Sequence, residues 1–119
     1  MTNPTGLPYT PVVRSGDWLI VSGQLGMVDG KLLNGGFEIE LRQVFVNLAD
    51  RLAEHGATMA DVVKTTVFLR HMTTDFPHLN ELYAEAFPEP RPARSAIGVA
   101  ELPLGGLVEI EAWARVPGT

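Results

Sequence analysis

The apolar residues of this chain change their spacing along the sequence, and that change limits the fold more than any other feature. Between Leu107 and Val116 they alternate, so one side of a strand is apolar and the other carries charges and a tryptophan. From Glu38 to His55 they recur at helical spacing, and Gly56 stands where a helix would end. A strand covered on one side, together with an amphipathic helix, predicts a sheet with helices on one face.

The same criteria predict the remaining elements. Two short hairpins are expected near the N-terminus, and a β-branched run predicts a buried strand at Val62–Leu69. A second helix should begin at Thr74 or Asp75, with Pro77 in its first turn, and a strand should follow from Ala93. The predicted fold is α+β: a single mixed sheet with two helices on one face. Residues 1–119 are expected to form one domain.

The predicted sheet face without helices bears on assembly. On the last strand this side carries Glu109, Glu111 and Trp113, so it mixes charge with an exposed ring. A half-apolar face that no helix covers needs a partner, and we therefore expect an oligomer built on it.

Composition excludes several classes of protein. The chain has no cysteine, which removes disulfides, thiolate metal sites and cysteine nucleophiles, and its histidines follow no zinc-site spacing. The net charge of −5 argues against binding to phosphate backbones, so no nucleic-acid partner is expected. The start of the sequence lacks the pattern of a secretory signal, and no apolar run could span a bilayer. These features predict a cytoplasmic protein without a membrane partner.

Arg94 is the first candidate site residue, because it lies inside an apolar run. Considered alone, it is more simply a strand arginine whose stem lies on the sheet and whose head reaches water or a glutamate. The alternative is an anion clamp, since a guanidinium matches a carboxylate with two parallel hydrogen bonds.

Glu109 and Glu111 are candidates of the same kind, and their relation to Arg94 depends on strand pairing. If the last two strands pair antiparallel through the "AELPLGG" turn, one register places Arg94 opposite Glu111 on one face. A slip of one residue separates them onto opposite faces. The sequence leaves this register open.

Three segments together resemble the Rid/YjgF family, the reactive intermediate deaminases, whose older label is L-PSP endoribonuclease. They are "LPYTPVVRSGDWLIVSGQLG", "MADVVKTTVFLRHMTTDFPHLNELYAEAF" and "RPARSAIGVAELPLGGLVEIEAWA". The resemblance implies a chorismate-mutase-like fold and a homotrimer with sites between subunits. It also implies hydrolysis of reactive 2-imino acids, such as 2-iminopropanoate or 2-iminobutanoate, to 2-oxo acids and ammonia, without a metal or an organic cofactor.

The resemblance also implies roles for individual residues. Arg94 matches the arginine that holds the substrate carboxylate, and Glu109 matches the glutamate that polarises the attacking water. The remaining matches concern the pocket around them: Tyr9 closes it, Ser22 and Gly23 form its backbone edge, Asn80 lies near it, and Ala96 stands where the family often has cysteine.

Other functions stay open at the level of sequence. The same residues suit an enamine of the 3-aminoacrylate type. A trimer that binds small carboxylates, or acts as a chaperone, would need no catalysis. The older family label leaves an endoribonuclease as a further alternative, against which the charge and the lack of a general-base histidine pair argue.

Overall fold

The structure is a computed structural model, and it describes residues 6–117. The elements follow one another in this order: β1 (Val12–Ser15), β2 (Trp18–Gln24), β3 (Met27–Val28), β4 (Lys31–Leu32), α1 (Phe37–Ala53), η1 (Met59–Asp61), β5 (Val62–Leu69), α2 (Met72–Ala86), β6 (Ala93–Gly98), η2 (Pro103–Gly105) and β7 (Val108–Arg115).

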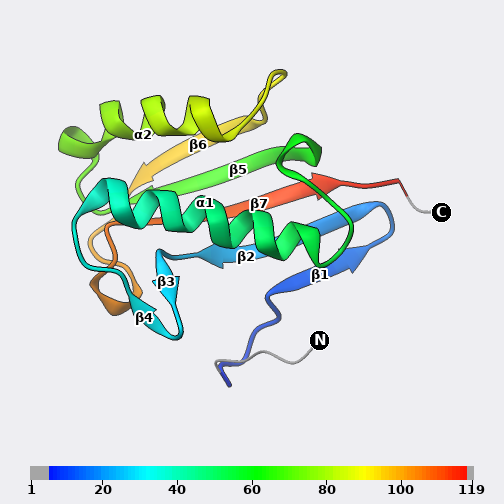
Figure 1. The fold of residues 1–119 in the computed structure, drawn as a ribbon, viewed down its shortest axis with the longest axis horizontal. Coiled ribbons are helices and arrows are strands. Elements are labelled where there is room, and N and C mark those ends of the chain that lie inside the picture. Colours follow the sequence, from blue (N-terminus) through cyan, green and yellow to red (C-terminus); the bar gives the residue numbers. More distant parts are fainter. Residues whose placement is uncertain (1–5, 118–119) are drawn as a thin grey trace.

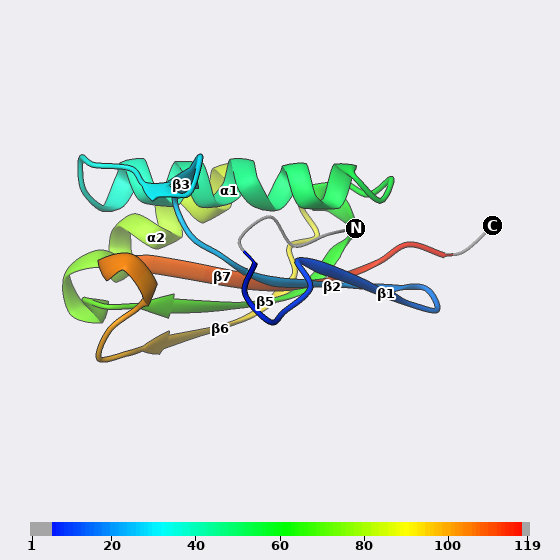
Figure 2. The ribbon, with the colours of Figure 1, turned by 90° about the horizontal axis from the view of Figure 1, so that it is seen from below.

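One sheet and a layer of two helices make up the fold (Figure 1). The strand order is β1-β2-β7-β5-β6, and β3 and β4 form a separate hairpin. Neighbours in the sheet are antiparallel except β5 and β6, which are parallel. Seen along the sheet, α1 and α2 lie on the same side of it (Figure 2). The predicted α+β architecture, with two helices on one face of a mixed sheet, is therefore confirmed.

The antiparallel pairing considered for the last two strands is wrong. β6 pairs only with β5, and β7 lies on the other side of β5, so β5 separates them. The cause is α2, because the chain that leaves β5 returns over the sheet through this helix and enters β6 parallel to β5. The ladders on both sides continue beyond the strands, since Val99 N–H donates to Leu69 O and Arg70 N–H donates to Leu107 O.

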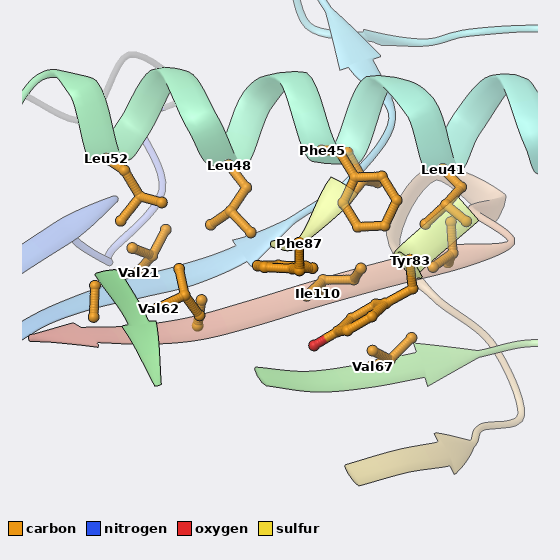
Figure 3. Close-up of a cluster of buried hydrophobic side chains, with 14 of the residues drawn as sticks. Val21, Leu41, Phe45, Leu48, Leu52, Val62, Val67, Tyr83, Phe87 and Ile110 are labelled. Atoms are coloured by element: carbon orange, nitrogen blue, oxygen red, sulfur yellow. The ribbon is translucent and has the colours of Figure 1, made fainter. Parts of the chain in front are cut away.

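The core lies between α1 and the sheet (Figure 3). The predicted helical repeat places Leu41, Leu48 and Leu52 against the strands, where all three are fully buried. Each such side chain stabilises the fold by roughly 1.5–3 kcal/mol relative to exposure. The helix ends as expected before Gly56, whose φ of 76° is a conformation that glycine adopts readily.

The second helix begins earlier than predicted, at Met72 rather than at Thr74 or Asp75. Asp75 N–H donates to His71 O at 2.9 Å, so Asp75 lies within the helix, and its carboxyl group is buried there. Pro77 consequently stands inside the helix rather than at its entrance. Proline cannot donate the helical hydrogen bond at its position, and the packing of Leu79, Leu82 and Tyr83 after it offsets that loss.

The face of the sheet without helices carries large exposed side chains. Trp18 and Trp113 meet edge to face there, with ring centroids 6.1 Å apart, and Val13 is 45% exposed. Within residues 6–117, no helix has the length and apolar character that crossing a bilayer requires.

Candidate functional site

Arg94 lies on the edge strand β6, on the side that faces α2. Its partner across the parallel ladder is Thr65, which points into the helix layer. Nη2 of Arg94 donates to Oδ1 of Asn80 at 2.8 Å, and its guanidinium carbon lies 5.6 Å from the ring centroid of Phe76 and 4.9 Å from that of Tyr83. The three neighbours share one face of α2, because they follow one another at intervals of four and three residues.

The partners of Arg94 are all neutral, unlike those of four other arginines of the chain. The four arginines that form ion pairs with a carboxylate of this chain are listed here: Arg42, Arg51, Arg91 and Arg115. Among the described residues, Arg94 pairs with no carboxylate, and its hydrogen bond to Asn80 uses only one of its donors. The remaining N–H groups can therefore donate two parallel hydrogen bonds to a carboxylate ligand.

Glu109 lies on the face of the sheet that carries no helix. Its partner in the β5 ladder is Phe68, whereas Val108 and Ile110 on either side of it point into the core. Burial raises the pKa of Glu109, and the negative charge of Glu111 raises it further. Among residues 6–117 no hydrogen-bond donor contacts this carboxylate. It can therefore exchange protons with a ligand or a water molecule.

Gly23 makes room for Glu109 at an irregularity in β2, between Val21 and Gln24. A Cβ built on Gly23 would lie 2.6 Å from Oε2 of Glu109, so any side chain at this position would displace the carboxylate. The requirement for glycine is thus one of space.

Ser22 fastens the N-terminal segment to the same place. Its Oγ donates to Thr10 O at 2.7 Å, and its N–H donates to Pro11 O at 2.9 Å. Tyr9 precedes this attachment and is 45% exposed, with its N–H bonded to Leu7 O. The hydroxyl of Ser22 is therefore engaged in a structural contact.

The predicted site residues fall into two groups. Arg94, Asn80 and Ala96 belong to α2 and β6, where Ala96 is half-buried two residues beyond Arg94 on the same side of the strand. The other group, around β2 and β7, consists of Tyr9, Ser22, Gly23 and Glu109. Within one chain, Arg94 and Glu109 lie on opposite faces of the sheet, so the chain does not bring them together.

Sequence reasoning missed two features, one beside Arg94 and one outside the candidate site. It did not single out Phe76 and Tyr83, although the polar Asn80 between them at helical spacing was a signal that this face of the helix meets a polar group. It also missed Glu40, which is only 4% exposed and accepts the N–H of Leu107 at 2.8 Å. Its position four residues before the buried Val44 was the available signal.

Metal-ligating side chains do not gather in the part of the chain that the structure describes. Residues 6–117 contain no cluster of three or more histidine, aspartate or glutamate side chains that could hold a metal ion.

Comparison with known proteins assigns the family. The family model for endoribonuclease L-PSP matches residues 2–116. A protein of Dermatophagoides farinae named 2-iminobutanoate/2-iminopropanoate deaminase is 42% identical over 106 residues, which cover 87% of this chain and 82% of that protein. A Bos taurus protein of the same name is 41% identical over 109 residues, covering 90% and 79%.

Solved structures agree with this assignment. The structure of RidA from an Antarctic Psychrobacter species superposes with a TM-score of 0.88 at 38% identity, over 93% of this chain and 90% of that one. Yeast Mmf1 superposes with a TM-score of 0.89 at 35% identity, over 97% and 91%. The chain therefore belongs to the endoribonuclease L-PSP family, the Rid/YjgF family that its sequence resembles.

Proposed function

We propose that this protein is a deaminase that hydrolyses reactive 2-imino acids to 2-oxo acids and ammonia. Two of the relatives described above are named for this activity on 2-iminobutanoate and 2-iminopropanoate. The observation that carries the proposal is Arg94, a cation whose partners within the described chain are all neutral. Such a group suits a small organic acid.

Substrate binding is the role of Arg94. Its free N–H groups pair with the substrate carboxylate, which fixes the neighbouring C2 atom in space. Holding the reacting carbon beside the catalytic group converts an encounter in solution into a step within one complex. Because an imine already reacts with water, this positioning supplies much of the help that the reaction needs.

Proton transfer is the role of Glu109. Water attacks C2 of the imine, and the carboxylate accepts a proton from it as the new C–O bond forms. The C=N double bond becomes single as water adds, and the nitrogen takes up the proton that Glu109 accepted. The new hydroxyl group then loses its proton as C=O forms, the C–N bond breaks with its electrons on nitrogen, and the nitrogen takes up that proton to leave as ammonia beside the 2-oxo acid. The raised pKa of Glu109 suits this exchange, since a base works best when its pKa approaches the working pH.

The active site in this proposal lies between protomers of a homotrimer. Arg94 and Glu109 occupy opposite faces of the sheet in one chain, which supports a site that combines Arg94 of one protomer with Glu109 of the next. The exposed rings of Trp18 and Trp113 on the face without helices support an assembly that covers that face.

Replacement of Arg94 by alanine tests this function. An amino acid oxidase generates 2-imino acids in situ, and semicarbazide traps whatever imine the protein has not hydrolysed. We expect Arg94→Ala to lower kcat/KM by about 10²-fold or more, because the substrate carboxylate loses the charged group that holds it. Arg42→Ala is the matched control, since Arg42 forms an exposed ion pair on α1.

Other outcomes would redirect the proposal. Full activity in Arg94→Ala would remove the carboxylate clamp. Pyruvate binding without turnover would identify a binding module. RNA cleavage that survives repurification and disappears in Arg94→Ala would favour a nuclease, while turnover of 3-aminoacrylate alone would narrow the substrate to that enamine.

A cytoplasmic location also stays a proposal, and the relatives include proteins named as mitochondrial and chloroplastic.

A further inference from the structure

One face of α2 surrounds the guanidinium of Arg94 with three neutral side chains, Phe76, Asn80 and Tyr83, which we call the α2 stripe. We propose that the α2 stripe is a positioning device, with Phe76 as its exposed outer member, that holds the guanidinium with its open edge toward the substrate carboxylate. This inference rests on the proposed function and assigns roles beyond the residues that touch the substrate.

Tyr83 forms the fixed part of the stripe. Its hydroxyl lies 2.6 Å from Oγ1 of Thr65, and its ring centroid lies 4.5 Å from that of Phe87 and 6.1 Å from that of Phe45. The residue is only 4% exposed. A ring held on several sides gives the guanidinium a surface of constant position.

Phe76 forms the outer part, and core packing does not explain its place. It is 36% exposed and is not among the buried residues of α2, which are Asp75, Leu79, Leu82 and Tyr83. Its ring lies against Arg94, with 5.6 Å between the guanidinium carbon and the ring centroid. A ring in this position attracts the cation and limits its rotation. Because Phe76 adds little to the core, its replacement should leave the fold intact.

Asn80 completes the stripe with a neutral acceptor. Its Oδ1 takes one N–H of Nη2 at 2.8 Å, which orients the plane of the guanidinium without neutralising it. An aspartate of the same shape would form an ion pair with Arg94 inside the protomer. The charge would then be satisfied before any substrate arrives.

Orientation matters here because an arginine on an edge strand has many accessible side-chain conformations. Bidentate pairing requires the plane of the guanidinium to match the plane of the carboxylate. A side chain ordered before binding loses less freedom when the ligand arrives, so a fixed Arg94 binds the substrate more tightly than a mobile one.

The first experiment replaces Phe76 and separates KM from kcat. We expect Phe76→Leu to raise KM about 3- to 10-fold with a smaller change in kcat, the range of a partly exposed cation–π contact. Phe76→Tyr should restore the wild-type KM, because it keeps the ring. The rise should be equal for 2-imino acids with different side chains. A rise that depends on the substrate side chain would overturn the proposal and make Phe76 a pocket wall.

A double-mutant cycle tests whether Phe76 acts through Arg94. In an Arg94→Lys background, Phe76→Leu should change KM little further, because the planar fork that the ring orients is already gone. Equal additional losses in both backgrounds would show an unrelated structural effect and would contradict positioning.

Substitutions of Asn80 test whether the partner of Arg94 at this position must be neutral. Asn80→Asp should raise KM more than Asn80→Ala, because the new carboxylate competes with the substrate for Arg94. Equal effects of the two substitutions would show that neutrality at this position is unimportant.

A readout without substrate separates this proposal from the deaminase activity itself. In the wild-type protein, the Nε–H bond of Arg94 should be ordered on the nanosecond timescale, which NMR relaxation measures. Phe76→Leu should make this bond more mobile, and Phe76→Tyr should not. If the wild-type protein hydrolyses no imine, the proposed function fails while this comparison still decides whether the α2 stripe orders Arg94. Equal mobility of this bond in all three proteins would overturn the positioning role.

Discussion

Two carboxylates of this protein, Glu40 under the helix layer and Glu109 on the opposite face of the sheet, share an electrostatic setting and differ in almost everything else. Burial is the main cause of a raised pKa in both, and a second acidic residue adds to it: Asp75 beside Glu40, and Glu111 beside Glu109. A perturbed pKa by itself would mark both as candidates for catalysis.

Their hydrogen bonds distinguish them. Glu40 accepts the N–H of Leu107 and so fastens the start of β7 to the first turn of α1. Glu109 accepts no hydrogen bond from the described residues and lies against Gly23, whose missing side chain leaves it space. The comparison teaches that a raised pKa indicates chemistry only where the group is accessible and has no structural partner.

The largest expected effect comes from Glu109→Gln. We expect kcat for imine hydrolysis to fall about 10²- to 10⁴-fold, the usual contribution of a positioned general base. The free energy of unfolding should not decrease, because burial already disfavours the charged form that the substitution removes. Steady-state kinetics and urea unfolding measure the two quantities. If Glu109→Gln instead lost affinity for pyruvate or became clearly less stable, the role of Glu109 would be structural or in binding, as that of Glu40 is structural.

Glu40→Ala should show the opposite pattern. It leaves the N–H of Leu107 without its acceptor, which should reduce the free energy of unfolding by about 1–3 kcal/mol, while kcat of the folded protein stays within a few-fold of wild type. Glu40→Gln is the matched control, since its amide oxygen can still accept that hydrogen bond. If Glu40→Ala abolished turnover at full stability, the distinction between the two carboxylates would fail.

The pH dependence of Glu40→Gln makes the same distinction sharper. The folded protein raises the pKa of Glu40, so the folded state binds this proton more tightly than the unfolded state. Protonation of Glu40 should therefore contribute to the free energy of unfolding of the wild-type protein at low pH. This contribution is lost as pH rises from the ordinary glutamate range through the raised pKa. Glu40→Gln lacks that part, and its stability relative to wild type should increase toward neutral pH.

The smallest expected effect is that of Glu111→Gln on the pH profile of kcat/KM. Glu109 must be ionised to act as a base, so activity falls as pH decreases through its pKa. Removing the charge of Glu111 removes one cause of the raised pKa, and the acidic limb should move to lower pH. Glu101→Gln, in an exposed loop, should leave the profile unchanged. A limb that moves to higher pH would show that Glu111 acts on Glu109 in another way.

Local pattern sufficed for the elements but not for their pairing. The repeat of α1 and the strand Val62–Leu69 were predictable from sequence because each depends on the residues within it. The place of β6 was not, because it depends on the path of the chain through α2 rather than on the residues of β6 and β7. The start of α2 was misplaced because proline usually favours the first turn of a helix, whereas here packing extends the helix before it.

The candidate site divides in the same way. Arg94 and Glu109 could be named from motifs, but their separation onto two faces could not, since a face is defined by register with a distant strand. Glu40 escaped notice because an acidic residue in the first turn of a helix is favourable at an exposed position too. Its spacing before the buried Val44 was the one local signal, and its contact with Leu107 explains why the carboxylate is buried.

The short path from α2 into β6 has an evolutionary consequence. Arg94 and the side chains that surround it all come from residues 72–98, one uninterrupted piece of chain, whereas Glu109 and Gly23 are brought together from strands at the two ends of the sequence. Substitutions in that single helix and its following strand can therefore alter the proposed acid-binding group while the strands that position Glu109 stay unchanged.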